Sequence, residues 1–526
     1  MDQIRAALGV GDVAEAEFLL RAQLLAMPSD IGAIARLAEL AGVQGKTVEA
    51  IALLRTALAI EPAAHELRLR LAQLHRAQGH VPEAMTHIEL LPQPVRCTFE
   101  VMAEEAGLLG QLGRREEEIA LYEELLRQEP RRIRSWISLA NALNYCGRPV
   151  EAIGALRRAI KIRPSSGEPW WSLANLKSFR FDNHDIAAMQ RALRRSGARE
   201  NSLQLHFALG SAFEARGNYA RSFDHYAAGN LLRAQGLQAH QIRVTGFVDE
   251  AIPVLSEALF KRLRGAGCPT SQPIFIVGLQ RSGSTLLEQI LSSHSQIEGA
   301  SELVAMQQVW AGVERQAVAN GLTPFGQLAA FQPSAVRALG EEYLERTKPF
   351  RPLNRPFFVD KLPANWLNIG LIRLALPNAK IIDARRNPMA CGFSNFKQLY
   401  GTGVTYAYSL QSIGWFYRDY LRLMRHIDQL QPGAVHRVIH DRLVENPERE
   451  VRRMLNYILV PFDRACLKFH ENPRFVPTPS AEQVRRPINR DGRDAWQPYK
   501  TWLGPLKEAL GPALSEWAEG AFPTGF

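Results

Sequence analysis

A loop rich in glycine and hydroxyl side chains, Gly278-Leu-Gln-Arg-Ser-Gly-Ser-Thr285, follows an apolar run at residues 274–277. Leucine and isoleucine residues then recur at helical spacing from Leu286 to Leu291. A strand, a loop and a helix N-terminus in this order form an anion site, because unpaired backbone N–H groups and the positive end of the helix dipole converge there. The spacing matches a Walker A loop, except that Ser284 stands where the lysine belongs.

The cation of this loop is an arginine. A nucleotide kinase uses its Walker lysine, together with Mg²⁺, to neutralise the phosphate that it transfers. A loop with an arginine and several hydroxyl groups suits a phosphate ester whose transferable group carries less charge, such as a sulfuryl group on a 5′-phosphate. We therefore predict a site without a metal ion, and none of the 13 histidines has a recognisable zinc-ligand spacing. The predicted anion contacts are Arg281, Ser282, Gly283, Ser284 and Thr285.

Other charged and hydroxyl side chains could complete such a site. Arg386 could bind a phosphate, and Ser394, eight residues later, could return to that phosphate from the following helix. Glu302 lies beyond the first helix and could act as a general base. Taken singly, these residues are more typical of a solvated strand end, a helix cap or a surface charge. A basic stretch could close the site over a polyanion or remain solvated; it contains Ser480, Arg485, Arg486, Arg490 and Arg493.

The second half of the chain alternates apolar runs with helical stretches. The runs at 274–277, 357–359 and 380–384 predict strands, and residues 436–443 give a weaker strand prediction. This alternation predicts a parallel α/β sheet, whose ligands bind at the carboxyl ends of the strands. The polar residues that fall at such ends are the 278–285 loop, Lys361, Arg385 and Arg386.

The first half carries an internal repeat of 34 residues. Small residues, turn glycines and a closing proline recur at this period, and Trp136 and Trp170 also lie one period apart. The pattern resembles tetratricopeptide repeats over about residues 1–230. This resemblance implies an α-helical solenoid whose concave surface binds a peptide or protein, or merely supports its neighbour. The repeated positions are Ala16, Ala50, Ala84 and Ala152, with Glu118 in the intermediate slot; Gly11, Gly45, Gly79, Gly113 and Gly147; and Pro28, Pro62, Pro130 and Pro164.

Length and composition limit the remaining possibilities. At 526 residues the chain exceeds one ordinary domain, so we expect a tetratricopeptide repeat array at 1–234, a helical linker at 235–270 and an α/β P-loop-like domain at 271–526. The net charge of +10 favours an anionic partner or a merely basic surface, and we expect no nucleic acid partner. No apolar run reaches the roughly 18 residues of a spanning helix, and no secretory leader is visible. The five scattered cysteines suit a reducing cytoplasm, so we expect a cytoplasmic protein.

Five stretches of the second half together resemble the sulfotransferase family. They are most like bacterial proteins that join tetratricopeptide repeats to a sulfotransferase domain, and they are also similar to tyrosylprotein sulfotransferases. The resemblance covers residue 273 to about residue 500. It implies the sulfuryl donor 3′-phosphoadenosine 5′-phosphosulfate. The stretches are IFIVGLQRSGSTLLEQILSSH, EGASEL, VDKLPANWLNIGLI, RRNPMACGFSNF and PSAEQVRRPIN.

The resemblance also implies roles for individual residues. The 281–285 loop would hold the 5′-phosphosulfate, and Arg386 and Ser394 would bind the 3′-phosphate. Glu302 lies 21 residues after Arg281, the family offset of the base that deprotonates an acceptor hydroxyl. The residues that match leaving-group contacts are Lys361 and Ser480, with Arg486 in place of a family lysine. The chain departs from the family at Gln280, where proline is common; at His440-Asp441, near a Tyr-Glu-x-Leu-Val stretch; and at Gln398, where tyrosylprotein sulfotransferases have a basic residue.

These patterns predict in-line transfer of a sulfuryl group to an acceptor hydroxyl, with Glu302 as base and Lys361 and Arg281 stabilising the leaving phosphate. The repeats favour a peptide or protein acceptor over a small molecule. His294 is an alternative base, although its place within the first helix favours packing. Two other functions remain open at this point: a P-loop kinase-like phosphotransferase, and a catalytically inactive repeat scaffold.

Overall fold

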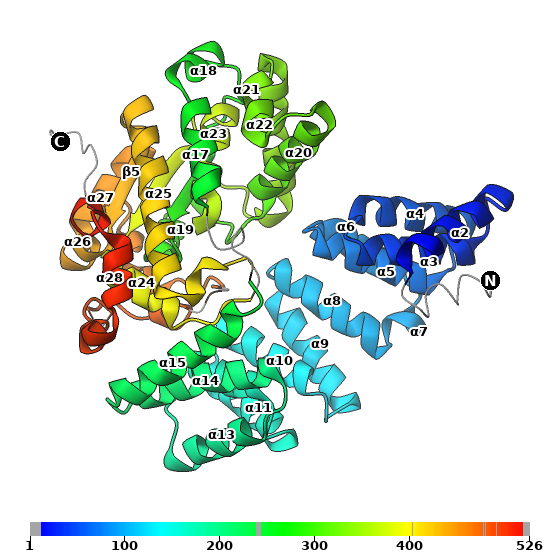
Figure 1. Ribbon diagram of the computed structural model, residues 1–526, viewed down its shortest axis with the longest axis horizontal. Coiled ribbons are helices and arrows are strands. Elements are labelled where there is room, and N and C mark those ends of the chain that lie inside the picture. Colours follow the sequence, from blue (N-terminus) through cyan, green and yellow to red (C-terminus); the bar gives the residue numbers. More distant parts are fainter. Residues whose placement is uncertain are drawn as a thin grey trace. The chain divides into compact units, whose positions relative to one another are not determined.

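The computed structural model describes residues 12–237, 244–401, 403–476, 478, 480–490 and 492–518. The chain forms two compact units, residues 1–142 and 143–526. Helices make up the first unit, and the second unit adds a parallel sheet to further helices (Figure 1). In the described ranges, no helix is both long enough and apolar enough for a membrane crossing.

The first unit is a series of helices joined by short turns. Pairs of successive helices pack on one another, as α3 does on α4 and α5 on α6. The helices are α2 (Val13–Ala26), α3 (Ile31–Val43), α4 (Thr47–Ile60), α5 (His65–Ala77), α6 (Val81–Glu89), the short α7 (Gln93–Arg96), α8 (Phe99–Gln111), α9 (Arg115–Gln128) and most of α10 (Ile133–Tyr145).

The 34-residue period corresponds to buried contacts and turns. The repeated alanines at 16, 50, 84 and 152 are fully buried. The glycines at 45, 79, 113 and 147 have φ between +73° and +78°, a left-handed conformation that favours glycine in each turn. Trp136 and Trp170 each donate their ring N–H to the carbonyl of a repeat proline, Pro130 at 2.9 Å and Pro164 at 3.1 Å. The predicted repeat array is confirmed, except that Gly11 lies outside the described residues.

The repeats continue into the second unit and share its core. Phe207 and Tyr226 belong to the same buried cluster as Phe275 of the sheet. The Ser222 hydroxyl bonds the Tyr499 hydroxyl at 2.9 Å, and the Asn230 amide donates to the Phe396 carbonyl at 2.8 Å. These repeats and the following helices are α11 (Pro149–Ile162), α12 (Gly167–Asn175), α13 (Asn183–Arg195), α14 (Arg199–Glu214), α15 (Tyr219–Ala234), α17 (Thr245–Val254) and α18 (Glu257–Arg262).

In the part of the chain that the structure describes, five parallel strands form the sheet in the order β2-β3-β1-β4-β5. The strands are β1 (Pro273–Gly278), β2 (Ile297–Gly299), β3 (Phe357–Asp360), β4 (Lys380–Arg385) and β5 (Val435–Ile439). The helices around the sheet are α19 (Ser284–Ser292), α20 (Ala305–Asn320), α21 (Pro324–Ala330), α22 (Pro333–Thr347), α23 (Ile369–Ala375), α24 (Pro388–Phe396), α25 (Leu410–Leu430), α26 (His440–Glu445), α27 (Pro447–Ile458), α28 (Gly504–Leu510) and α29 (Ala513–Glu516).

Both faces of the sheet are buried, which explains the continuous apolar runs in the sequence. Along β1, Ile274 and Ile276 belong to one buried cluster, whereas Phe275 and Val277 belong to the other. The three strands predicted from apolar runs and the parallel α/β sheet are confirmed. The prediction over 436–443 was only partly right, because the strand ends at Ile439 and α26 begins at His440.

Candidate functional site

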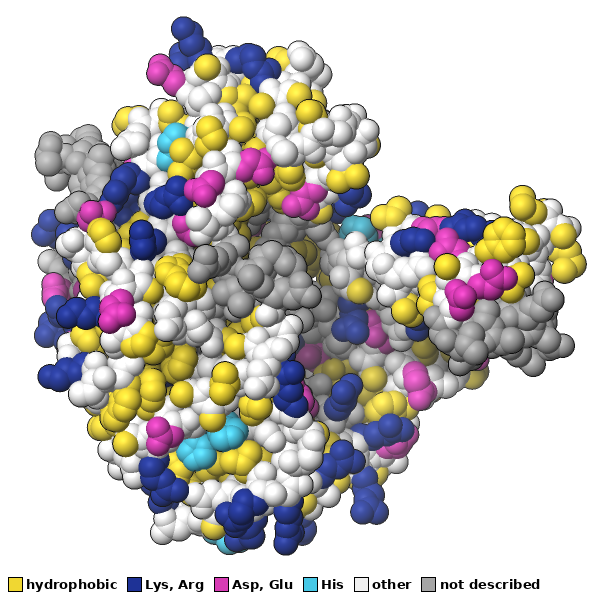
Figure 2. Space-filling model, viewed as in Figure 1, with side chains coloured by type: hydrophobic (Ala, Val, Ile, Leu, Met, Phe, Trp, Pro, Cys, Tyr) yellow, Lys and Arg dark blue, Asp and Glu magenta, His cyan; other side chains and the backbone are white. Residues whose placement is uncertain are grey.

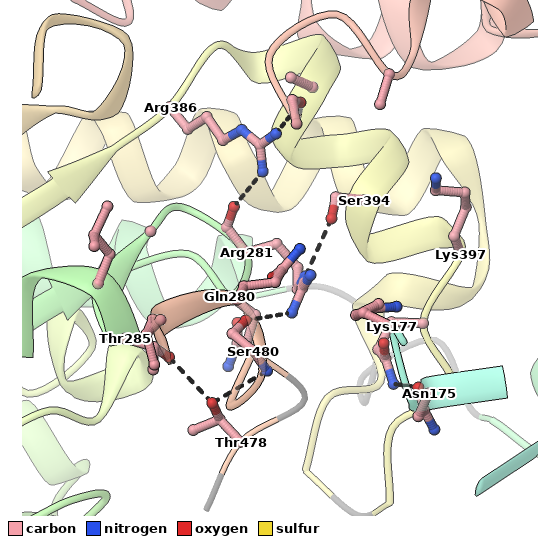
Figure 3. A pocket seen from close by; sticks show the side chains of 18 of the residues that line it. Asn175, Lys177, Gln280, Arg281, Thr285, Arg386, Ser394, Lys397, Thr478 and Ser480 are labelled. Atoms are coloured by element: carbon pink, nitrogen blue, oxygen red, sulfur yellow. Dashed lines mark hydrogen bonds between the residues drawn. The ribbon is translucent and has the colours of Figure 1, made fainter. Parts of the chain in front are cut away.

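A cavity of about 720 Å³ opens where the strands end (Figure 3). Its lining includes residues that follow β1, β2, β4 and β5 along the chain, among them Arg281, Glu302, Arg386 and His440. Residues of the repeats, from Trp171 to Tyr226, line the same cavity. The cavity therefore occupies the position at which parallel α/β sheets bind ligands.

The 278–285 loop is a tight turn that leads from β1 into α19. Gly278, Arg281 and Gly283 have φ values of +140°, +67° and +100°. Gly283 caps the helix, and a Cβ atom there would lie 2.7 Å from Cδ2 of His440. Ser282 is 3% exposed, and its hydroxyl oxygen has no hydrogen-bond partner among the described residues. The loop thus brings a helix N-terminus without side-chain bulk to the cavity, as an anion site requires, while the Ser282 hydroxyl lies buried within the loop.

Arg281 contacts three residues that each lie more than a hundred positions away from it in the chain. Its Nε donates to the Ser394 hydroxyl at 3.1 Å, and its Nη1 donates to the Ser480 hydroxyl at 3.0 Å. Its carbonyl oxygen accepts a hydrogen bond from Nη1 of Arg386 at 3.1 Å. Figure 3 shows these four residues converging on the cavity from the loop, from α24, from the end of β4 and from the segment that carries Thr478, Ser480 and Arg486, here called the late segment. Four of the residues predicted to bind the donor are therefore neighbours.

Arg386 is held by backbone groups on both sides. Besides its bond to the Arg281 carbonyl, it donates to the carbonyl of Gly492, while its Nε is buried without a partner among the described residues. Burial lowers the pKa of this guanidinium, with Arg281 adding a smaller repulsive contribution. A buried cation with a free N–H beside another cation is a place where an anion stabilises the protein.

Glu302 and Lys361 form an ion pair at the cavity. The Lys361 side chain is 1% exposed, and its ammonium contacts Glu302, whose side chain is 46% exposed. The backbone N–H of Lys361 donates to the Ser301 carbonyl at 2.9 Å, which ties the end of β3 to the segment after β2. The predicted base and the predicted leaving-group lysine are therefore in direct contact, with the carboxylate on the open side.

Glu288 lies behind this ion pair and was not predicted as a site residue. It is 1% exposed on α19, and its Oε2 lies 3.8 Å from Nζ of Lys361. Its Oε1 accepts the Ser301 N–H at 3.0 Å and also contacts Arg474. One buried carboxylate thus holds Lys361 and the residue before Glu302. A glutamate within the otherwise apolar spacing of Leu286–Leu291 was the signal that the sequence offered.

The hydroxyl residues at the start of α19 face the late segment. Thr285 lies 3.4 Å from the Thr478 hydroxyl, and Thr478 accepts the Ser480 N–H at 3.2 Å. Ser284 is buried and also lines the cavity. This arrangement places Ser480 above the helix N-terminus, while Pro479 of the predicted motif lies outside the described residues.

The predicted basic stretch divides into different roles. Arg486 is exposed and lines the cavity. Arg485 instead donates to the Tyr145 carbonyl at 3.0 Å, and Arg493 pairs with Glu445 at 2.7 Å. Ser480 and Arg486 therefore line the cavity, whereas Arg485 and Arg493 bind other protein groups. Arg490 is exposed and does not line the cavity.

The positions that depart from the family pattern have structural partners. The Tyr406 hydroxyl donates to Oε1 of Gln280 at 2.6 Å, and Asn395 donates to the Gln280 carbonyl at 2.8 Å, so the loop is fixed without proline. Burial lowers the pKa of His440 to about 3, which makes it a neutral imidazole against Gly283. His294 is fully buried, and its ring nitrogens bond the Pro461 carbonyl and the Gln296 N–H, an arrangement that suits packing.

Residues 273–464 match the sulfotransferase family, and residues 44–96 and 104–167 match the tetratricopeptide repeat. These matches cover the sheet with its loop and parts of the helical repeats.

Relatives show similarity over parts of the chain. An uncharacterised protein of Aquifex aeolicus is 30% identical over 334 residues, which are 61% of this chain and 44% of that protein. Protein-tyrosine sulfotransferase 1 of Danio rerio is 25% identical over 249 residues, or 42% of this chain and 65% of that protein. The chain thus spans between two fifths and two thirds of these relatives. The solved sulfotransferase domain from the curacin biosynthetic pathway aligns with a TM-score of 0.32 and 19% identity, over 44% of this chain and 91% of that one.

Proposed function

Because the chain joins tetratricopeptide repeats to a sulfotransferase-family domain, we propose that it transfers a sulfuryl group from 3′-phosphoadenosine 5′-phosphosulfate to an acceptor hydroxyl. The observation that carries the proposal is the contact between Glu302 and Lys361 at the cavity that the 281–285 loop also lines. An acceptor base and a buried cation beside an anion-binding loop are the groups that such a transfer requires.

The residues present fit a donor with two anionic ends. The unpartnered Ser282 hydroxyl and the N-terminus of α19 suit the 5′-phosphosulfate, together with Arg281, Ser284 and Thr285. Arg386, with its unpartnered Nε, and Ser394 suit the 3′-phosphate. Arg281 hydrogen-bonds both Ser394 and Ser480, so the guanidinium lies between residues assigned to the two ends of the donor.

In the proposed reaction, a bond forms between the acceptor oxygen and sulfur as the bond between sulfur and the bridging oxygen breaks. Glu302 accepts the acceptor proton, and its exposed carboxylate allows a hydroxyl to approach. Lys361, Arg281 and Ser480 stabilise the charge that develops on the leaving phosphate. Arg486, exposed at the cavity, would contact the nucleotide as the late segment closes over it.

For the acceptor we propose a peptide or protein in preference to a small molecule, because the repeats supply a solenoid of the kind that binds extended chains.

The net charge of +10 does not itself select an acceptor. Figure 2 shows Lys and Arg side chains over α13, where Arg191, Arg194 and Arg195 are exposed on the surface and do not line the cavity. We also propose a cytoplasmic location, because the five cysteines are odd in number and far apart in the sequence, which suits a reducing compartment.

The proposal is tested by incubating the full chain with ³⁵S-labelled donor and a cell extract, and then separating protein from small-molecule products. We expect label in protein, and we expect Glu302→Gln to bind 3′-phosphoadenosine 5′-phosphate normally while losing turnover. Label confined to small molecules would exclude the protein acceptor. Two results would exclude the sulfotransferase function. One is that the wild-type chain binds ATP and transfers phosphate; the other is that it binds neither ATP nor 3′-phosphoadenosine 5′-phosphate.

A further inference from the structure

The repeats contribute part of the wall of the donor cavity. The segment that follows α12 enters the cavity next to the loop after β1 (Figure 3). Trp171, Lys177, Phe179 and Arg180 of the repeats line the cavity together with Arg281. All these residues belong to the compact unit 143–526. The cavity therefore has a wall that a sulfotransferase domain beginning at residue 271 would lack.

Two hydrogen-bonded contacts fix this segment against the sulfotransferase domain. Glu482 accepts the backbone N–H of Lys177 at 3.0 Å and that of Ser178 at 2.8 Å. On the other side, the Gln398 amide donates to Oδ1 of Asn175 at 3.4 Å. Since Glu482 follows Ser480 by two residues, the late segment and the repeat segment are held together. The position of the Lys177 backbone is thus set by groups that surround the donor cavity.

The carboxylates near Lys177 are already engaged by other groups. Glu482 uses both oxygens for the backbone N–H groups of the repeat segment. Glu214 binds the Lys397 ammonium at 2.5 Å and the Tyr226 hydroxyl at 3.0 Å. Over the described ranges, the Lys177 ammonium has neither a hydrogen bond nor an ion pair. Among the charged groups, Arg281 and Lys397 have the largest effects on the pKa of Lys177, and both lower it.

The cavity wall therefore holds more positive charge than its own carboxylates neutralise. The pKa of Lys177 is lowered to about 8, mainly by burial and then by repulsion from Arg281 and Lys397, which outweighs the attraction of Glu214 and Glu482. An anion in the cavity would offset this repulsion and raise the pKa of Lys177. Gln398 also lines the cavity, but its amide is uncharged and adds no positive charge there.

We propose that Lys177 of the repeat segment binds the 3′-phosphate of the donor nucleotide, so that the repeats form part of the donor site. The inference rests on the proposed function. It is favoured by the position of Lys177 beside the elements that carry the other 3′-phosphate residues: Gln398 and Lys397 directly follow α24, which carries Ser394. Through Lys177, the repeats supply a further cation near Gln398, whose own side chain is uncharged.

The test compares nucleotides with and without the 3′-phosphate. Titration calorimetry would measure 3′-phosphoadenosine 5′-phosphate and adenosine 5′-phosphate against the full chain, wild type and Lys177→Ala. Loss of one charged hydrogen bond predicts an affinity about 10- to 100-fold lower for the bisphosphate, with adenosine 5′-phosphate unchanged. Lys177→Arg should retain most of the affinity. Lys161→Ala removes an exposed lysine of α11 as the matched control and should change neither affinity.

The protonation of Lys177 gives a second measurement. Since its pKa is about 8 in the free protein, wild-type affinity for the bisphosphate should fall as pH rises above 8, and Lys177→Arg should flatten that fall. Equal weakening of both nucleotides would place Lys177 at the 5′ group and overturn the assignment. Unchanged bisphosphate affinity with a raised acceptor KM would place it at the acceptor instead. A wild-type chain that does not bind the bisphosphate would refute the proposed function itself. Because Lys177→Ala removes repulsion, its thermal unfolding midpoint should not decrease.

Discussion

Replacement of Lys361 by methionine separates its catalytic charge from its packing. The side chain is 1% exposed, so the apolar stem of methionine can occupy the same buried space. The substitution removes the cation that contacts Glu302 and that lies 3.8 Å from Glu288. Glu288 keeps Arg474 and the Ser301 N–H as partners, so its charge is not left isolated.

The expected loss is larger in catalysis than in stability. One preorganised electrostatic donor contributes about 10²–10³ in kcat, or about 2.7–4 kcal/mol of the barrier. Loss of one partner from a buried carboxylate that keeps others should lower the free energy of unfolding by about 1–3 kcal/mol. Affinity for 3′-phosphoadenosine 5′-phosphate should change less than about tenfold, because Arg281, Arg386 and the loop remain.

The assay is steady-state transfer from ³⁵S-labelled donor, with urea unfolding and product-nucleotide binding measured on the same preparations. Lys348→Met is the matched control, since that exposed lysine pairs only with Glu345 in the contacts of the described residues. The double variant with Glu302→Gln should lose less than the sum of the two single effects, because the two side chains act in one ion pair. A folded Lys361→Met protein with kcat within about tenfold of wild type would refute the proposed role.

Two further changes test the surroundings of the site. Arg386→Ala should weaken binding of 3′-phosphoadenosine 5′-phosphate by about 10- to 100-fold, measured by calorimetry, and unchanged affinity would mean that the 3′-phosphate lies elsewhere. Burial raises the pKa of Asp360 to about 8, well above its ordinary value of 3.8, so its folded form prefers the proton. That preference stabilises the fold fully below about pH 4 and is lost as pH rises through about 8. Urea unfolding from pH 5 to 8 should therefore show wild type losing stability relative to Asp360→Asn, whereas parallel profiles would contradict the assigned pKa.

The sheet was predictable because burial on both faces leaves a direct mark on the sequence. The residues of β1 at 274–277 pack into two different cores, so each of them is apolar. β2 has only three residues, one of which is Glu298. That glutamate is 3% exposed and accepts the Leu353 N–H at 2.8 Å. A short strand with a buried, partnered carboxylate carries no periodic signal, and it was therefore missed.

The same reasoning separates the site residues that sequence patterns could find from those that they could not. Arg281, Arg386 and Ser394 follow strands or sit on the next helix, so the topology of a parallel sheet brings them together. Lys177 is held at the cavity by a hydrogen bond from its backbone N–H to Glu482, which lies 305 positions away in the sequence. No local pattern encodes such a contact, because it depends on how the last repeats pack against the sheet.

That packing gives the repeats a structural part in the proposed donor site. The compact unit that contains the cavity begins at residue 143, and Phe207 and Tyr226 are buried in the core that also contains β1. Glu482 links the repeats, through the Lys177 N–H, to the late segment, and Arg281 contacts Ser480 of that segment. Displacement of the 175–178 segment would therefore move a donor-binding cation and loosen the segment that carries Ser480 in a single step. Because both belong to one hydrogen-bonded unit, any ligand that shifts the last repeats would change donor affinity, even if it never touches the sheet.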